Sequence, residues 1–176
     1  MSPAAEGVTP VQVVLRPMRW WDVADLVPLE RDLFGASAWS AEAFWSELAH
    51  PSARWYLVAR AARVEQARIE EGRGERGRGD GGDRVLGYAG VMVTDGEADV
   101  QTVAVAPTAQ GRGLGTTLLT ALLDRAAEQG ARRVTLEVRA DNAPAIALYQ
   151  RHGFTRVAIR RGYYQPEGAD AWIMQR

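Results

Sequence analysis

The sequence predicts a single layered domain of the α/β or α+β class. Segments rich in β-branched residues alternate with segments whose apolar residues recur at helical spacing, and such a mixture folds into helices packed on a sheet. The chain has 176 residues, a usual length for one domain with its own hydrophobic core. No segment repeats internally, which agrees with a single unit.

The first half of the chain contains three expected strands and two expected helices. The strands are expected at residues 11–18, 54–62 and 84–94. A first helix is expected from Asp22, which we predict as its N-cap, although Pro28 is expected to kink or split it. Ser40 is predicted to cap a second, short helix over residues 41–49.

The second half alternates strands and helices in the same way. Strands are expected at residues 99–105 and 132–140 and twice within the tail, residues 155–176. One helix follows the glycine-rich stretch 108–117 and ends at Gly130. The last helix lies within residues 141–154, with Asn142 as its cap and Gly153 just past its end.

Two segments are expected to lie outside the packed domain, which spans residues 11–176. Residues 1–10 lack a basic-then-apolar pattern, so they indicate a flexible leader and not a signal peptide. Residues 65–84 consist of glycine and charged residues with almost nothing apolar, which predicts a disordered hairpin insert. The alternative is that the insert's arginines bind RNA, but acidic residues balance them and no aromatic residue lies among them.

Composition excludes several classes of function. The net charge of -1 gives no whole-chain attraction to nucleic acid or membrane, so neither is expected as a partner. The chain has no cysteine and only 2 histidines, so disulfides and a cysteine nucleophile are excluded and no metal site is expected. The longest mainly apolar run, "VLGYAGVMV", is far shorter than the roughly 20 residues of a membrane helix. We therefore expect a cytoplasmic, soluble protein.

The stretch "TAQGRGLGTT", residues 108–117, predicts an anion-binding loop. It follows a strand and opens a helix, whose first N–H groups and dipole favour a negative charge. A phosphate-binding P-loop needs a lysine, and this chain has none. The dinucleotide fingerprint needs a third glycine at a position that falls on Thr116 or Leu118, so it fits poorly.

A third loop pattern, [RQ]-x-x-G-x-[GA], is met by Gln110, Gly113 and Gly115, and here the chain resembles the GCN5-related N-acetyltransferase (GNAT) family. A later stretch of that family, N-x-x-A-x-x-L-Y-x-x-x-G-F, matches Asn142 to Phe154. The resemblance implies a GNAT fold, a mixed sheet of about six to seven strands flanked by about four helices. It also implies that the loop binds the pyrophosphate of coenzyme A.

Glu137 and Tyr149 are the candidate catalytic residues. Acetyl transfer from a thioester to an amine needs a base for the amine and a proton for the departing thiolate. Glu137 lies in mid-strand, where it is either a tuned base or a solvated charge, and Tyr149 is either a proton donor or a core tyrosine. The stretches "LEVRADNAPAIALYQRHGF" and "RRGYYQPEGADAWIM" resemble the RimI type of this family, the ribosomal-protein-alanine N-acetyltransferases. That resemblance implies that Glu137 accepts a proton and Tyr149 donates one.

The same resemblance implies the remaining contacts. Contacts with acetyl-CoA are expected at Val103, Ala104, Val105, Gly111, Arg112, Gly113, Leu114, Gly115, Thr116 and Asn142. The peptide groove is expected to contain Trp39, Tyr163 and Tyr164, aromatic residues that otherwise pack the edge of the core.

The expected reaction is acetylation of the N-terminal α-amine, of the alanine type, of a small-subunit ribosomal protein. An α-amine has a pKa of about 7.7–8.0 against about 10.4 for lysine, so a weaker base suffices to deprotonate it. Two alternatives stay open: acetylation of a small-molecule amine, and a non-catalytic module that binds acyl-CoA.

Overall fold

A computed structural model of the chain describes residues 12–62 and 84–176. The expected leader at 1–10 lies outside these residues, as does the expected insert apart from Arg84. The strands are β1 (Gln12–Pro17), β2 (Arg54–Ala62), β3 (Val85–Thr94), β4 (Glu97–Val105), β5 (Arg133–Arg139), β6 (Thr155–Tyr164) and β7 (Ala169–Gln175). The helices are α1 (Val23–Phe34), α2 (Ala41–Leu48), α3 (Leu114–Glu128) and α4 (Ala143–Arg151).

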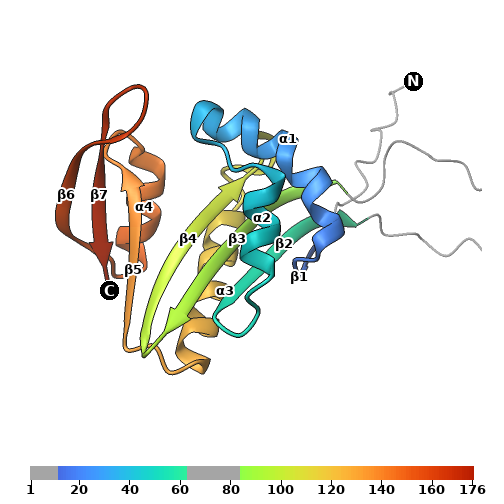
Figure 1. Ribbon diagram of the computed structural model, residues 1–176, viewed down its shortest axis with the longest axis horizontal. Helices are drawn as coiled ribbons and strands as arrows, with labels where there is room; N and C mark the ends of the chain where they lie inside the picture. Colours follow the sequence, from blue (N-terminus) through green and yellow to red (C-terminus); the bar gives the residue numbers. More distant parts are fainter. Residues whose placement is uncertain (1–11, 63–83) are drawn as a thin grey trace, which may run out of the picture.

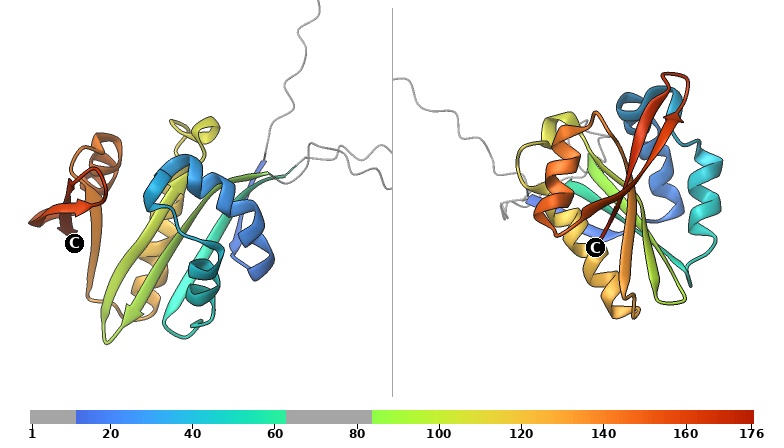
Figure 2. Two further views of the ribbon diagram at one scale, coloured as in Figure 1. Left: turned by 45° about the horizontal axis from the view of Figure 1, so that its top comes forward. Right: turned by 90° about the vertical axis from the view of Figure 1, so that its left-hand side faces the viewer.

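The described strands form one 7-stranded sheet in the order β1-β2-β3-β4-β5-β7-β6. The pair β4–β5 is parallel, and the other neighbouring pairs are antiparallel. Helices α1 and α2 cover one face of the sheet, and α3 and α4 cover the other (Figures 1 and 2). The predicted class, a mixed sheet between two layers of helices, is therefore confirmed.

Each face of the sheet has its own hydrophobic core. On the α3 side, Leu118, Leu119 and Leu122 are fully buried against the sheet. On the α1 and α2 side, Leu26 and Phe44 are fully buried in a second cluster. Strands with two covered faces carry apolar residues on both, which explains the nearly continuous apolar run in β3.

The sheet opens between β4 and β5, and this opening positions the functional site. These parallel strands pair only from Glu97 opposite Arg133 to Val100 opposite Leu136. Beyond that point β5 continues along β7, while β4 stays with β3 after a register shift at Gly90. Figure 1 shows the two strands diverging from their paired end.

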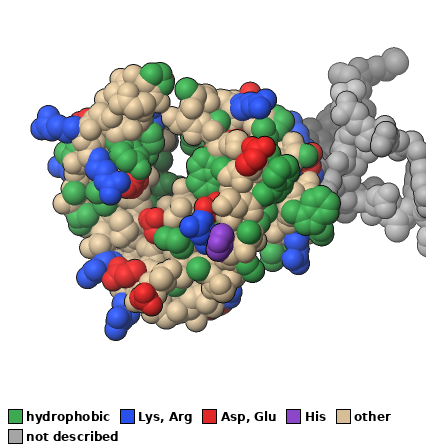
Figure 3. All heavy atoms as spheres, viewed as in Figure 1, with side chains coloured by type: hydrophobic (Ala, Val, Ile, Leu, Met, Phe, Trp, Pro, Cys, Tyr) green, Lys and Arg blue, Asp and Glu red, His purple; other side chains and the backbone are tan. Residues whose placement is uncertain are grey.

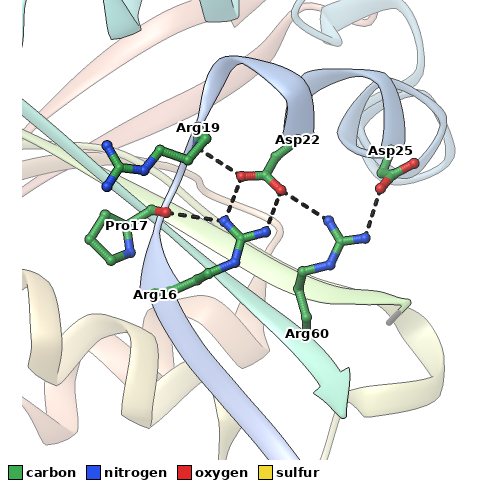
Figure 4. A network of polar contacts seen from close by, with 6 residues as sticks. All are labelled: Arg16, Pro17, Arg19, Asp22, Asp25 and Arg60. Carbon is green, nitrogen blue, oxygen red and sulfur yellow. Dashed lines mark hydrogen bonds and ion pairs between the residues drawn. The ribbon is translucent and has the colours of Figure 1, made fainter. Parts of the chain in front are cut away.

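Asp22 occupies the N-cap position of α1, as predicted, but the predicted capping role of its side chain is wrong. Its carboxylate makes no capping bond to that helix; instead it accepts from the Arg19 N–H and pairs with Arg16 and Arg60 (Figure 4). Two guanidinium groups are stronger partners for a buried carboxylate than a neutral helix N–H. Pro28 does not split α1, which continues through it.

The other predicted caps are confirmed. Ser40 Oγ accepts from the Ala43 N–H at the start of α2, and Asn142 Oδ1 accepts from the Ala145 N–H at the start of α4. Gly130 and Gly153 follow α3 and α4 with φ of 77° and 85°, the left-handed backbone that ends a helix.

Candidate active site

The glycine-rich loop leads from the end of β4 into α3. Gly111 and Gly113 have φ of 71° and 83°, a backbone conformation that is strained for any residue with a side chain. Gln110 fixes the loop to the strand, because its Nε2 donates to the Val105 carbonyl oxygen at 3.1 Å. No side chain caps the start of α3, so the first N–H groups of this 15-residue helix have no side-chain acceptor, and such groups at a helix N-terminus favour an anion.

A first cavity of about 510 Å³ lies between this loop, the end of β4 and α4. Most of the predicted cofactor residues line it, namely Val103, Val105, Gly111, Gly113, Leu114, Gly115, Thr116 and Asn142. Two do not: Ala104 is buried in the core on the opposite face, and Arg112 lines a separate cavity of about 780 Å³ with Arg84. The glycine-rich loop therefore lines the first cavity, but its residue Arg112 does not.

A second cavity of about 190 Å³ lies on the α1 side of the sheet. Residues of α1, of the turn after it, of β4 and β5 and of the tail hairpin form its walls. Both cavities are lined by Val103, Asn142, Ala145 and Tyr149. The two cavities thus meet at the opening between β4 and β5, where the space-filling view shows a hollow flanked by hydrophobic side chains (Figure 3).

Tyr149 lies at this junction. Its side chain is 7% exposed and packs edge-to-face on Phe154, with the ring centroids 6.0 Å apart. Burial, together with the nearby Tyr164, raises the pKa of Tyr149 to about 12. The phenol therefore keeps its proton at neutral pH and is a donor toward either cavity.

Glu137 lies on β5 and lines the second cavity. It is neither fully buried nor solvated: the side chain is 27% exposed, and Arg160 Nη1 lies 2.6 Å from its Oε1. A hydrogen bond with Glu137 also raises the pKa of Tyr163. The hairpin β6–β7 therefore supplies two partners that orient this carboxylate.

The three predicted groove residues differ in their positions. Trp39 and Tyr164 line the second cavity, and Tyr163 does not. Tyr163 is 46% exposed and lies edge-to-face against Tyr164, with the ring centroids 5.2 Å apart. It contributes through its contacts with Glu137 and Tyr164.

Sequence reasoning missed Glu30, which also lines the second cavity. Its Oε1 accepts from the Trp39 N–H at 3.0 Å, and its buried Oε2 has no hydrogen-bond partner among the described residues. Burial raises the pKa of Glu30 to about 7, against the opposing effect of the Trp39 N–H. A signal was available: Glu30 lies four residues after the buried Leu26, so the helical pattern places a carboxyl on the apolar face.

Comparison with known proteins identifies the family. The model of the acetyltransferase (GNAT) family matches residues 26–154. The chain belongs to the GNAT acetyltransferase family. Among the described residues of this GNAT chain, no acidic or histidine cluster could hold a metal ion, and no helix has the length and hydropathy of a membrane span.

Two relatives of this GNAT chain are mycobacterial. The N-alpha-acetyltransferase RimI of Mycobacterium tuberculosis is 39% identical over 160 residues, covering 88% of this chain and 86% of the relative. An uncharacterized protein of Mycobacterium leprae is also 39% identical over 160 residues. The match spans only 38% of that longer relative.

Solved structures agree with the fold. The ribosomal-protein-S18-alanine N-acetyltransferase of Escherichia coli is 29% identical, with a TM-score of 0.71 and coverage of 93% of this chain and 92% of that chain. NAA60 of Arabidopsis thaliana in complex with acetyl-CoA has a TM-score of 0.72 at 21% identity, covering 94% of this chain and 98% of that one. The expected GNAT fold of the RimI type is thus confirmed.

Proposed function

We propose that this protein is an acetyl-CoA-dependent N-terminal acetyltransferase of the RimI type, acting on the α-amine of a small-subunit ribosomal protein. The observation that carries the proposal is the pair of cavities that meet at Tyr149. The names of the M. tuberculosis and E. coli relatives support the choice of an N-terminal amine as acceptor. A cytoplasmic location, where ribosomal proteins are made, agrees with it.

The first cavity suits acetyl-CoA. The N–H groups at the start of α3 would bind the pyrophosphate, since a helix N-terminus favours an anion. The free backbone edge of β4 from Val103 to Val105, beyond its pairing with β5, would hold the pantetheine and the thioester carbonyl. Asn142 already caps α4 with its Oδ1, which leaves its amide N–H groups for the cofactor.

The second cavity suits the acceptor amine. Glu137 would take a proton from the α-ammonium, directly or through water, and the neutral nitrogen would attack the thioester carbon. As the C–N bond forms, the C–S bond breaks, and Tyr149 would donate its proton to the departing thiolate sulfur. The nitrogen would then lose its second proton, directly or through water, to the Tyr149 phenolate, which restores the phenol and leaves the amide. Trp39 and Tyr164 would line the path of the peptide.

The test is turnover by the recombinant protein. Acetyl-CoA is supplied with peptides that begin with Ala, Ser, Gly or Met, and free thiol is followed over time. We expect thiol release with an alanine-initiated peptide and no release when the peptide's amine is already acetylated. Release with spermidine but with none of the peptides would contradict the proposal and favour a small-molecule amine.

A non-catalytic acyl-CoA-binding module is the other alternative. It predicts that Glu137→Gln and Tyr149→Phe leave the cellular effects of the protein intact. The proposed function predicts instead that these variants strongly reduce N-terminal acetylation while acetyl-CoA still binds. Mass spectrometry of protein N-termini from cells that carry each variant distinguishes the two.

A further inference from the structure

The second cavity contains a carboxyl group to which the proposed mechanism gives no role. Glu30 is 3% exposed, and the two oxygens of its carboxyl group have different environments. Oε1 accepts from the Trp39 N–H, which fixes the turn after α1. Oε2 is buried, lacks a partner among the described residues, and belongs to a side chain that lines the cavity.

Such an arrangement costs stability in the absence of a ligand. A buried polar atom without a hydrogen bond destabilises the folded state, and an unpaired buried charge destabilises it further. Fixing the turn needs only one oxygen, and an amide or a hydroxyl could supply it. A structural role therefore accounts for the hydrogen bond that Oε1 accepts, but not for a buried Oε2 without a partner.

We propose that Glu30 binds the α-ammonium group of the acceptor through Oε2 in the second cavity. This rests on the proposed function only in that the acceptor is an amine. An ammonium group supplies both the hydrogen bond and the positive charge that Oε2 lacks. Glu30 and Glu137 then hold the acceptor nitrogen from the α1 side and the β5 side of one cavity, next to the thioester.

Binding of the ammonium group is coupled to the loss of a proton from Glu30. Because burial raises the pKa of Glu30 to about 7, the empty site is largely protonated below neutral pH and avoids a buried charge. A bound ammonium group favours the carboxylate, so binding expels that proton. The other titratable or charged side chains lining the cavity are Glu137, Arg139, Tyr149 and Tyr164.

These neighbours do not replace Glu30 as the proton source. Glu137 is paired with Arg160, and Arg139 is paired with Asp141 and Glu167. The pKa values of Tyr149 and Tyr164 are raised, so both phenols stay neutral below pH 8. A proton released near pH 6 on amine binding therefore comes from Glu30.

The first test uses the wild-type protein saturated with CoA, so that no turnover occurs. An alanine-initiated peptide and the same peptide with hydrogen in place of the α-amine are titrated by calorimetry in buffers of different ionisation enthalpy. We expect the amine peptide to bind at least about tenfold more tightly, releasing nearly one proton at pH 6. At pH 8 we expect net proton uptake in place of release, because about half of the peptide's α-amine is neutral at that pH and gains a proton on binding. The peptide without the amine releases none.

The second test uses Glu30→Gln, whose side-chain oxygen still accepts from the Trp39 N–H. We expect it to bind CoA normally, to lose most of the wild-type preference for the amine peptide and to release no proton at pH 6. Asp99→Asn is the matched control, since burial also raises the pKa of Asp99 but this residue does not line the cavity. Asp99→Asn should keep the wild-type ratio of the two peptide affinities and the wild-type proton release.

The outcomes separate this inference from the proposed function. Equal binding of the two peptides by the wild type, or an unchanged ratio in Glu30→Gln, overturns the role of Glu30. Should Glu30→Gln not fold, the wild-type ratio and proton release decide. If spermidine binds and the peptides do not, the proposed function fails, and the same proton release measured with spermidine still decides for or against Glu30.

Discussion

Tyr149 illustrates how one buried side chain acquires a function from its position. Tyr149 packs on Phe154 within the hydrophobic core, and it also lines both cavities. Burial makes its hydroxyl a weaker acid than in water, so the phenol keeps its proton at neutral pH, as the proposed donor role requires. The residue is at once part of the core and part of the site.

Replacement of Tyr149 by Phe tests that role. We expect kcat with an alanine-initiated peptide to fall about 100-fold, because general acid catalysis typically contributes 10²–10⁴-fold. The KM for acetyl-CoA should change little, since the ring remains. Tyr88→Phe is the control: its hydroxyl is also buried, but it lies in the core beneath α2 and lines neither cavity. Equal losses in both variants would contradict the proposed role.

Asp22 shows the opposite case, a buried charge that maintains the architecture. Burial by itself would raise its pKa, but the hydrogen bonds from Arg16 and the Arg19 N–H, with the charges of Arg16 and Arg60, outweigh burial and lower it. The contacts measure 2.6 Å to Arg16 and 3.0 Å to Arg60 (Figure 4). They tie β1 and β2 to the start of α1, the helix that carries Glu30.

Replacement of Asp22 by Ala is expected to lower the free energy of unfolding at pH 7 by roughly 3 kcal/mol, because it removes the buried carboxylate that pairs with both Arg16 and Arg60. The lowered pKa fixes the pH dependence. Stability from Asp22 is fully present above its ordinary pKa of 3.8 and is lost as the pH falls below that value. Urea denaturation between pH 2 and pH 7 measures both effects. A wild type and variant that differ equally at pH 2 and pH 7 would refute this account.

At the scale of elements, α3 has two ends with different tasks. Gly113 and Gly130 flank the helix, both with positive φ, and a Cβ at either position would meet nothing within 4 Å. The backbone requirement is therefore the same at both ends. Only the Gly113 end lies at the cavity assigned to acetyl-CoA.

Comparison of Gly113→Ala with Gly130→Ala distinguishes the cost of backbone strain, which both variants share, from an effect on acetyl-CoA binding, which is expected only at Gly113. Each variant should lose about 1–2 kcal/mol of stability, since a left-handed backbone costs an L-residue that much. Only Gly113→Ala should also weaken acetyl-CoA binding, measured by calorimetry, because its loop must hold the N–H groups in place. Similar affinities for both variants would argue against the loop as the pyrophosphate site.

At the scale of the whole molecule, the opening of the sheet brings two cavities into contact, and we propose that each cavity binds one substrate. The helix α3 borders the first cavity, α1 borders the second, and α4 contributes residues to both at the place where β4 leaves β5. If the cavities hold the two substrates as proposed, the acceptor nitrogen reaches the thioester while both are bound. The chain has no cysteine to carry an acetyl group in between.

This geometry predicts a sequential mechanism. Initial velocities measured against both substrates should give intersecting lines, as expected for a ternary complex. Labelled CoA should not exchange into acetyl-CoA when the peptide is left out. Parallel lines, or exchange without peptide, would indicate an acetylated enzyme and contradict direct attack.

Much of the site could be predicted because its signals are local. Glycines at a strand-to-helix turn, Asn142 as a cap and the alternation of Val134, Leu136 and Val138 each depend on a few neighbouring residues. The partners of Glu137 could not be predicted, because Arg160 reaches it from another strand. The role of Asp22 was mistaken for the same reason, since Arg60 lies 38 residues away along the chain.

The sequence by itself determined the fold class, the family and the anion loop, because periodicity, caps and glycine positions are properties of short segments. Tertiary structure alone decided that Arg112 lies apart from the first cavity, that Glu137 is ion-paired and that Glu30 lines the second cavity. Burial and charge pairing depend on which distant segments pack together. That packing is set by the whole sheet, and above all by where β4 and β5 part.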